Sequence, residues 1–540
     1  MGFRMPEGVG LYRARAVVQD SIHGIIPVNE VEYYLLQTPF LRRLHDVKQL
    51  GLSYLVFPSA THSRLEHSLG VMHLASRVAE RVVAASRRSS RVCSTLFHRC
   101  DDMVYSAFIQ VSRLAGLLHD LGHPPFSHML EDAIRDLVFN PVERGVSDGD
   151  TLRGLEEAKL RVLELGEFGK IHEVYTVYFA RKLAELSESS GYEDLSLLLT
   201  LSLESIKPGS THINDSDLEE LGVRVEACRL INSIISSGLV DVDRLDYLVR
   251  DAKYTGVVYG YIDIDRVLEN LEVRVEGEEV SISVPPKGFQ PIEDVFDARF
   301  KMYKSVYYHH KFVGVQLALD IAFTRALIEW GELQPKPYSE LLENPGELLN
   351  PLKLSNLIAG GLVYFDDVDV MSIFRLMAVK GGRVGRRWAK ALLHERPLLP
   401  ISLVKRTDEV IAEISRKTGR PVRDIAQVIE QLFHEGEAFT GVVERSVLRR
   451  ARELGLSPDE VEVERLTVRI VREVTGSPRG VIEASLYIRM LAEVASTPIV
   501  LAHAYSNSED AHLKLYRDRE RLRKAFIGEL VGEVIGRLKA

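Results

Sequence analysis

The sequence predicts a mainly α-helical protein with one small β-hairpin and a mixed α+β region toward its C-terminus. Over residues 30–270, and again over 293–331, apolar residues recur mostly every three or four positions, as on helices that pack against a core. Between these ranges, residues 271–286 form two arms of alternating apolar and polar residues around Glu276-Gly277-Glu278. This alternation predicts a hairpin.

A chain of 540 residues is long enough for two to four domains, or for one large domain with an appendage. We predict a helical domain over 1–335, an α+β extension of it over 336–400 after a proline-rich break, and a helical and mixed domain of unknown role over 401–540. Signals that start helices recur in the last part at Thr407-Asp408, Ser457-Pro458-Asp459 and Ser506-Asn507.

The composition is that of an ordinary soluble globular protein, with 46% hydrophobic and 27% charged residues. A formal net charge of −9 argues against wholesale electrostatic binding to nucleic acid or anionic membrane, although local basic patches are not excluded. We find no apolar run of the roughly 18 residues that a membrane span needs, and no signal peptide. Cys93, Cys100 and Cys228 are too few and too unevenly spaced for a disulfide framework, which suits a reducing, cytoplasmic setting.

Residues 113–130, RLAGLLHDLGHPPFSHML, combine an apolar stripe of leucines with ionisable side chains. The stripe predicts a core-facing helix that ends at Gly122 and the two prolines that follow. The ionisable residues lie in the last turn of this helix, in the turn beyond it and on the next element; they are His119, Asp120, His123 and His128. A buried ionisable group is costly unless it is paired or holds a metal. This segment therefore needs partners from elsewhere in the chain.

One candidate partner lies upstream, in THSRLEHSLG. Ser63, followed three residues later by Glu66, predicts a helix that starts with a capping box. Arg64 and His67 then share one face of that helix, three residues apart. Each residue alone would pass for a surface or capping side chain.

A second candidate lies downstream, in SGLVDVDRLDYLVRDA, where a helix is predicted after Gly238. Asp243 and Tyr247 share a face of it with Arg250, and Asp246 can pair with Arg250 at four-residue spacing. The motifs together offer a mixed nitrogen and oxygen ligand set, which suits Fe, Mn, Ni, Co or Zn with positions left for water and substrate. The set is His67, His119, Asp120 and Asp243.

This order of residues matches the H…HD…D signature of the HD-domain phosphohydrolases. Longer motifs narrow the match: the stretch from DSIHGIIPVNEV to RLEHSLGV, then HDLGHPPFSHMLED, HEVYTVYFA and DVDRLDYLVRDAKYTG, resembles the deoxynucleoside triphosphate triphosphohydrolases. The resemblance covers roughly residues 16–330, with a weaker echo to about 400. It implies an HD-domain helical core and attack of water on the α-phosphorus of a dNTP, releasing deoxynucleoside and triphosphate.

The resemblance implies that the four-residue set holds a divalent transition metal, with room for a second ion, Mg²⁺ or Mn²⁺. It also implies a group that protonates the leaving 5′-oxygen. We expect His172 or His128 to be this acid and His123 to contact water or phosphate. The resemblance pairs Glu131 with the histidine in the turn, and Glu173 follows His172 as in a family His-Glu pair that could orient the imidazole.

The resemblance further implies a set of substrate-binding residues, namely Arg64, Gln49, Leu50, Arg244, Tyr247, Asp251, Arg299, Tyr303 and Tyr307. The arginines would hold the triphosphate, and Arg244 replaces a family lysine. Tyr247 would leave no room for a 2′-hydroxyl, while Gln49 and Asp251 would bind the 3′-hydroxyl. Tyr303 and Tyr307 would lie beside the nucleoside.

A basic stretch resembles a region in which the family binds an effector nucleotide, and its candidate residues are Arg386, Arg387 and Lys390. A solvated loop is the alternative. The family's guanine-nucleotide activating site has an aspartate and an arginine where this chain has Gln37 and His45, so we do not expect GTP activation in that form. The resemblance alone implies a homo-oligomer, a dimer or tetramer, and we expect no SAM domain because little precedes Asp20.

Two other functions stay open from the sequence. The chain could be another HD phosphohydrolase that attacks a monophosphate, a cyclic dinucleotide or (p)ppGpp. It could instead be a nucleotide-sensing or nucleic-acid-binding protein on the same fold. The complete ligand set argues against lost catalysis, and the acidic total charge argues against a nucleic-acid role.

Overall fold

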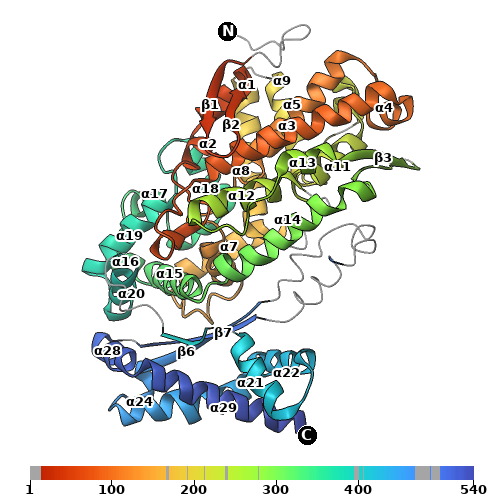
Figure 1. The fold of residues 1–540 in the computed structure, drawn as a ribbon. Coiled ribbons are helices and arrows are strands. Elements are labelled where there is room, and N and C mark those ends of the chain that lie inside the picture. Colours follow the sequence, from red (N-terminus) through yellow and green to blue (C-terminus); the bar gives the residue numbers. More distant parts are fainter. Residues whose placement is uncertain are drawn as a thin grey trace. The chain divides into compact units, whose positions relative to one another are not determined.

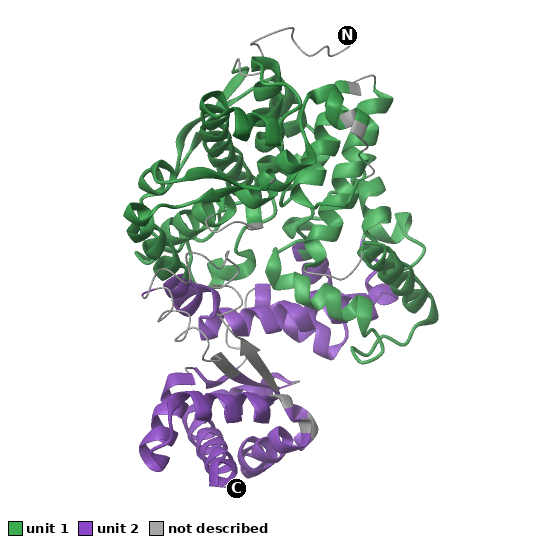
Figure 2. Cartoon of the chain, turned by 90° about the vertical axis from the view of Figure 1, so that its right-hand side faces the viewer, with its two compact units in different colours: residues 1–299, 336–370, 476–485 green, residues 300–335, 371–475, 486–540 purple. Residues whose placement is uncertain are grey.

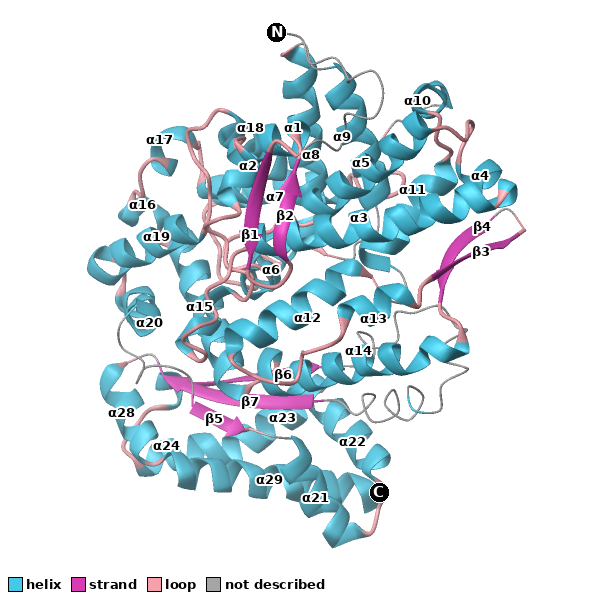
Figure 3. Ribbon diagram, turned by 45° about the horizontal axis from the view of Figure 1, so that its top comes forward, coloured by secondary structure: helices cyan, strands magenta, loops and turns pink. Residues whose placement is uncertain are grey.

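The computed structural model describes residues 14–539, except 166–169, 191–192, 212, 214, 238–240, 278, 394–400, 406, 469–486, 488–498 and 507. The predicted mainly α-helical fold is confirmed (Figures 1 and 3). Strands in the described part of the chain form two antiparallel pairs and one three-stranded sheet. Parts of three predicted signals, Gly238, Glu278 and Asn507, lie outside the described residues.

The chain divides into two compact units (Figure 2). Unit 1 comprises residues 1–299, 336–370 and 476–485, and unit 2 comprises 300–335, 371–475 and 486–540. No helix among the described residues is long and apolar enough to cross a membrane.

Unit 1 is a set of helices packed mainly through α3, α5, α8, α9 and α12. Its helices are α1 (Glu30–Leu36), α2 (Pro39–Arg43), α3 (Arg64–Arg88), α4 (Ser90–Leu96), α5 (Asp102–Leu118), α6 (His128–Phe139), α7 (Gly149–Leu163), α8 (Ile171–Ser189), α9 (Glu193–Ile206), α10 (Asp215–Leu221), α11 (Val225–Asn232), α12 (Val242–Thr255), α13 (Ile264–Glu269), most of α14 (Phe289–Met302), α17 (Tyr338–Leu341) and α18 (Pro351–Ala359).

Local capping fixes where the helices of the predicted site begin. Ser63 and Glu66 form the predicted capping box at the start of α3. The carboxylates of Asp101 and Asp241 accept backbone N–H groups at the starts of α5 and α12. These caps set the register of the helices, and therefore decide which side chains face the interior.

Unit 1 contains two hairpins. The predicted one is confirmed as β3 (Glu272–Glu276) paired with β4 (Glu279–Ser283). The other pairs β1 (Ala16–Asp20) with β2 (Gly24–Val28) and has no counterpart in the sequence-based expectation. Its strands, AVVQD and GIIPV, do not alternate apolar and polar residues, so periodicity does not predict them.

Unit 2 confirms the predicted α+β character of the C-terminal region. Its antiparallel sheet has the order β5-β7-β6, and helices pack with it around buried residues such as Ile429, Leu432 and Phe526. Its elements are α15 (His310–Ile328), α16 (Trp330–Leu333), most of α19 (Asp367–Lys380), α20 (Arg383–Leu393), β5 (Ile401–Val404), α21 (Thr407–Thr418), α22 (Val422–His434), α23 (Gly436–Val443), α24 (Arg449–Glu453), β6 (Val461–Val468), β7 (Ile499–Ser506), α28 (Glu509–Arg517) and α29 (Arg519–Lys539).

One predicted helix start in unit 2 is wrong. At Ser457 a capping box forms, but it closes only a 3₁₀ turn at Pro458–Glu460. The chain continues as β6, all eight residues of which pair with β7. The alternation of VEVERLTV explains the outcome, because a period of two fits a strand and outweighs a local helix cap.

Two of the three cysteines are joined. Cys93 and Cys100 form a disulfide with their Cα atoms 6.1 Å apart, while Cys228 is free and buried. The spacing of the cysteines does not predict this pair. The chain reverses between α4 and α5, and the cysteine spacing does not reveal that reversal. The reversal is held by backbone pairing of Phe97 with Val223.

Gly122, in the turn after α5, lies against the backbone of α8. A Cβ at this position would come within 2.0 Å of the Thr176 backbone nitrogen and 2.4 Å of the His172 carbonyl oxygen. Backbone atoms cannot rotate away as a side chain can. The turn that carries the predicted site therefore packs directly on α8.

We expect Gly122→Ala to lower the free energy of unfolding by about 1–3 kcal/mol or more, because the methyl group must push α8 away. Gly149→Ala is the matched control, since a Cβ there meets nothing within 4 Å. Urea unfolding of both variants measures the difference. Equal stability of the two variants would contradict the close approach.

Candidate metal centre and active site

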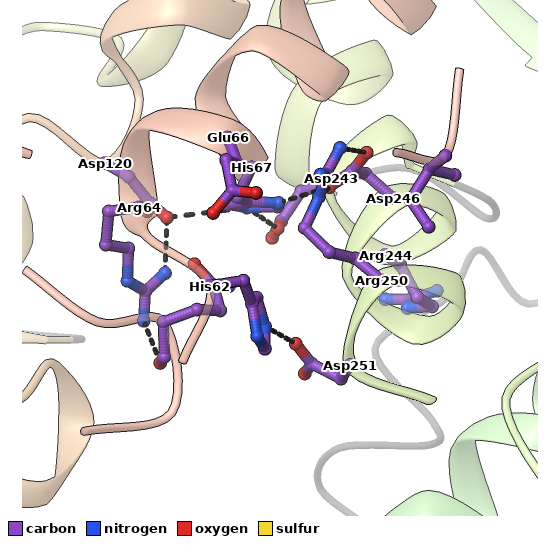
Figure 4. A network of polar contacts seen from close by, with 12 residues as sticks. His62, Arg64, Glu66, His67, Asp120, Asp243, Arg244, Asp246, Arg250 and Asp251 are labelled. Carbon is purple, nitrogen blue, oxygen red and sulfur yellow. Dashed lines mark hydrogen bonds and ion pairs between the residues drawn. The ribbon is translucent and has the colours of Figure 1, made fainter. Parts of the chain in front are cut away.

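The four predicted metal ligands converge in unit 1, and Figure 4 shows three of them, His67, Asp120 and Asp243. His67 Nε2 lies 3.1 Å from Asp243 Oδ1 and 3.5 Å from Asp120 Oδ2. His119 Nε2 lies 3.4 Å from the same Asp120 oxygen and 3.8 Å from Asp243 Oδ1. Ligand atoms that each lie about 2.0–2.2 Å from one ion are separated from one another by distances close to those measured here. The arrangement therefore fits a single metal ion.

Hydrogen bonds on the far side of each imidazole fix which nitrogen faces this cluster. His67 Nδ1 donates to Asp246 Oδ2 at 2.8 Å, and His119 Nδ1 donates to the Gly116 carbonyl at 2.8 Å. A carboxylate and a carbonyl only accept, so the proton is on Nδ1 and the Nε2 lone pair is free. Both Nε2 atoms are buried and have no hydrogen-bond partner, as expected of atoms placed to bind a metal.

The surrounding charges keep the ligand carboxylates ionised. Burial raises the pKa of Asp243, but the close His119 and His67 imidazoles outweigh this effect and hold the pKa far below its usual value. Burial likewise opposes ionisation of Asp120, whose pKa is nevertheless well below its usual value because of the His119 and Arg64 charges. Two carboxylates therefore offer negative charge to a cation.

A buried network behind His67 supports the ligand set. Asp246 accepts hydrogen bonds from His67 and from His23 Nε2, the latter at 2.6 Å, and pairs with Arg250 as predicted. Arg250 also pairs with Asp20 at the end of β1. Sequence spacing could not place His23 and Asp20 here, because they lie more than 220 positions from their partners.

Arg64 joins the metal cluster to two neighbouring segments. Its Nη1 pairs with Asp120, Nε donates to Ser127 Oγ at 2.9 Å, and Nη2 donates to the Gln49 carbonyl at 3.4 Å. The guanidinium is buried, and it is one turn from His67 on α3 as the capping box predicts.

The predicted catalytic residues form a second cluster beside the first. Glu131, on α6, accepts from His128 Nδ1 at 2.7 Å and from His172 Nδ1 at 2.9 Å. The His123 ring stacks on His172 with centroids 4.0 Å apart, and its Nε2 lies 3.3 Å from Asp120 Oδ1. Three imidazoles therefore meet next to the metal ligands, close enough to hold an ion themselves.

Two features distinguish these histidines. The His128 side chain is 54% exposed, whereas those of His172 and His123 are 8% and 1% exposed. Glu173, expected to orient His172, instead pairs with Lys207 at 2.6 Å. Consecutive residues on a helix point in different directions, so His172 and Glu173 cannot face the same site.

The residues predicted to bind the sugar lie near α12 and the start of α3. His62 Nε2 donates to Asp251 Oδ1 at 2.7 Å, and the His62 ring stacks on Tyr254. Gln49 is buried with its side-chain Oε1 unpartnered, and its backbone N–H bonds the His62 carbonyl. His62 has no role in the sequence-based expectation. Its only signal is its place in THSRLEH, two residues before Arg64.

Of the remaining predicted substrate residues of unit 1, two are arginines, one is a tyrosine and one is a leucine. Burial raises the pKa of Tyr247 to about 12, against the lowering effect of the Arg299 and Arg244 charges. Both arginines are buried, and Arg244 pairs with Asp241 at 3.1 Å. Leu50 is half-buried and directly precedes the 3₁₀ helix Gly51–Leu55.

Other predicted residues belong to unit 2. Tyr303 and Tyr307 contact each other edge to face, with ring centroids 4.9 Å apart. Arg386 is exposed and bonds the Gly381 carbonyl, whereas Arg387 is buried and donates to Ser506 at 3.1 Å. Lys390, one turn further along α20, is half-buried.

The part of the chain that carries these residues matches a known protein family. The HD domain family matches residues 64–251, which begin at Arg64 and end at Asp251. Residues 64–251 are an HD domain. The resemblance inferred from the motifs is confirmed, and the predicted metal ligands His67, His119, Asp120 and Asp243 all lie within the matched range.

Relatives of known sequence extend the match beyond the HD domain. An uncharacterised protein of Methanocaldococcus jannaschii is 30% identical over 360 residues, 67% of this chain and 55% of that protein. The deoxynucleoside triphosphate triphosphohydrolase SAMHD1 of Homo sapiens is 27% identical over 312 residues, 57% of this chain and 44% of that protein. The chain thus spans about half the length of the curated relatives it matches.

Solved structures share the fold of the chain. A phosphohydrolase from Bacteroides thetaiotaomicron superposes with a TM-score of 0.55 at 22% identity, covering 91% of this chain and 99% of that one. A hypothetical protein from Aquifex aeolicus gives a TM-score of 0.51 at 25% identity, covering 93% and 99%.

We expect Asp246→Asn to weaken binding of a divalent metal about 10- to 100-fold, because an amide supports the His67 imidazole less well than a carboxylate. Titration of the purified protein against a competing chelator measures the affinity. Asp265→Asn is the control, since Asp265 is exposed and pairs with Arg77 on the surface. A folded Asp246→Asn protein with unchanged affinity would contradict the supporting role.

Proposed function

We propose that the chain is a metal-dependent phosphohydrolase that cleaves dNTPs to deoxynucleoside and inorganic triphosphate. The observation that carries the proposal is the pair of unpartnered Nε2 atoms, on His67 and His119, that face two ionised carboxylates. The printed function of the SAMHD1 relatives supports the choice of dNTP as substrate. A divalent ion held by this set would make water more nucleophilic near neutral pH and neutralise phosphate charge.

The substrate would be held by cations and oriented by its sugar. Arg64, Arg244 and Arg299 supply buried positive charge for a triphosphate, which carries about four negative charges. Gln49 offers a free buried oxygen, and Asp251 is held in place by His62. A 3′-hydroxyl between them would satisfy these groups, and the Tyr247 ring would exclude a 2′-hydroxyl.

For the proton that the leaving 5′-oxygen needs, we propose His128. Glu131 holds its Nδ1, which leaves Nε2 to face a substrate, and its exposure gives it access that His172 and His123 lack. Glu131 also stabilises the protonated form of the imidazole. His172 shares the Glu131 carboxylate, and thereby fixes its orientation.

Further features of the proposal follow the family resemblance. The metal is Fe, Mn, Ni, Co or Zn, and a second Mg²⁺ or Mn²⁺ would accompany the substrate. An effector nucleotide would bind near Arg386, Arg387 and Lys390. The protein would act in the cytoplasm as a dimer or tetramer.

We expect the purified protein, supplied with Mn²⁺ or Mg²⁺ and each dNTP with and without the others, to release triphosphate and deoxynucleoside. Asp120→Ala removes a metal ligand and should abolish the release. Asp132→Ala should not, because Asp132 is exposed on α6. Chromatography identifies the products.

Other products would contradict the proposed reaction and indicate a different function. Orthophosphate or pyrophosphate as the released group would indicate another HD phosphohydrolase. Tight nucleotide binding without turnover would indicate a nucleotide sensor.

We expect His128→Gln to lower kcat about 10²- to 10⁴-fold with metal content unchanged, as for loss of a general acid. His98→Gln is the control, since His98 is exposed in the loop between α4 and α5. Steady-state kinetics on the preferred dNTP measure the effect. If only His172→Gln lowers kcat by this factor, the proton donor is the buried histidine instead.

A further inference from the structure

The turn that joins α5 to α6 has an unusual backbone where it approaches His128. φ is +57° at Phe126 and +55° at Ser127. Residues with a Cβ seldom adopt this region. Such a backbone persists only where surrounding groups hold it in place. The same turn carries His123, so whatever holds it also sets the position of two active-site histidines.

One carboxylate from outside the HD domain holds this turn. Asp367, the first residue of α19, is 4% exposed. Its Oδ1 accepts the Phe126 N–H at 2.6 Å, and its Oδ2 accepts the Lys48 N–H at 3.0 Å. Lys48 is tied to the turn a second time, because its carbonyl accepts the Ser127 hydroxyl at 2.7 Å. Asp367 therefore joins the histidine-bearing turn to the segment that contains Gln49.

A buried arginine holds the opposite end of the same turn. Arg43 is 1% exposed and donates to the carbonyl of Leu121 at 3.2 Å and to the carbonyl of His123. Its Nε donates to the Phe365 carbonyl at 3.0 Å, two residues before Asp367. The segment Phe365–Asp367 is thus linked to both ends of the turn.

Burying the Asp367 carboxyl group at this position costs free energy. Burial raises its pKa to about 7, although the backbone N–H groups of Phe126 and Lys48 oppose the rise. A buried carboxyl that stabilised nothing else would be costly. The two hydrogen bonds that it accepts from backbone N–H groups explain why a carboxylate stands here. The side-chain amide of asparagine has one oxygen in place of two and could accept only one of them.

We propose that Asp367 is a positioning residue for the active site: by binding the Phe126 and Lys48 backbone, it holds His123, His128 and Gln49 in register with the metal ligands. The inference deepens the proposed phosphohydrolase function and rests on it. Asp367 touches none of the proposed reacting groups itself, and it acts only through the turn and the Lys48 segment.

The neighbouring residue provides a matched control. Asp366 is also buried, and burial raises its pKa to about 6. Its Oδ1, however, accepts the N–H groups of Val368 and Asp369, so it caps its own helix. Both Asp366→Asn and Asp367→Asn therefore remove a buried carboxylate at the start of α19. Asp367→Asn alone also removes the hydrogen bonds to the Phe126 and Lys48 backbone.

The experiment compares both variants of the full chain by kinetics and by hydrogen exchange. We expect Asp367→Asn to lower kcat about 10- to 100-fold with metal content unchanged, as for a small misplacement of catalytic groups. We expect faster exchange in peptides that contain Phe126 and Lys48. Asp366→Asn should keep kcat within about threefold of wild type and leave the exchange of these peptides unchanged.

Each outcome decides the proposal. Unchanged exchange at Phe126 and Lys48 in Asp367→Asn overturns it, and so does faster exchange with unchanged kcat. An equal loss of kcat in the two variants also overturns it, because it indicates general destabilisation. If Asp367→Asn does not fold, Asp367→Ser, which places no amide NH2 group against the backbone N–H groups, should give the same changes. If wild type hydrolyses no dNTP, the proposed function fails, and exchange alone decides whether Asp367 holds the turn.

Discussion

The proton on Nδ1 of two buried histidines is the constraint on which the site depends. Asp246 and the Gly116 carbonyl take the Nδ1–H bonds of His67 and His119, and so leave both Nε2 lone pairs facing the same two carboxylates. Without these bonds each imidazole could turn or change its tautomer, and the cluster would be a set of buried ion pairs. Metal binding therefore depends on the groups that accept the Nδ1–H bonds as well as on the ligand atoms themselves.

The same logic extends outward through the unit. Asp246 is itself held by Arg250 and His23, and Glu131 holds two imidazoles by their Nδ1 atoms in the neighbouring cluster. Buried charges are tolerated because each has a partner. Glycine contributes in another way: Gly122 lets the histidine-bearing turn lie on the backbone of α8, where a side chain would not fit. The supports of the site are therefore charged, paired and closely packed.

Features that depend on neighbouring residues could be predicted from the sequence, and features that depend on distant ones could not. The capping box at Ser63, the hairpin at 271–286 and the Asp246–Arg250 pair all arise within a few positions. The four predicted metal ligands could be picked out because their motifs are long and occur in a fixed order. His23, His62 and Asp367 were missed, since each acts on a partner far along the chain. At Ser457 a local signal was overruled by pairing of β6 with β7.

Anomalous diffraction from crystals grown with Mn²⁺ tests the central claim most directly, because it locates an ion without reference to activity. The account predicts one strong peak about 2.0–2.2 Å from the Nε2 atoms of His67 and His119 and from carboxylate oxygens of Asp120 and Asp243. A peak held only by His123, His128 and His172, or no peak within reach of His67 and His119, would contradict it.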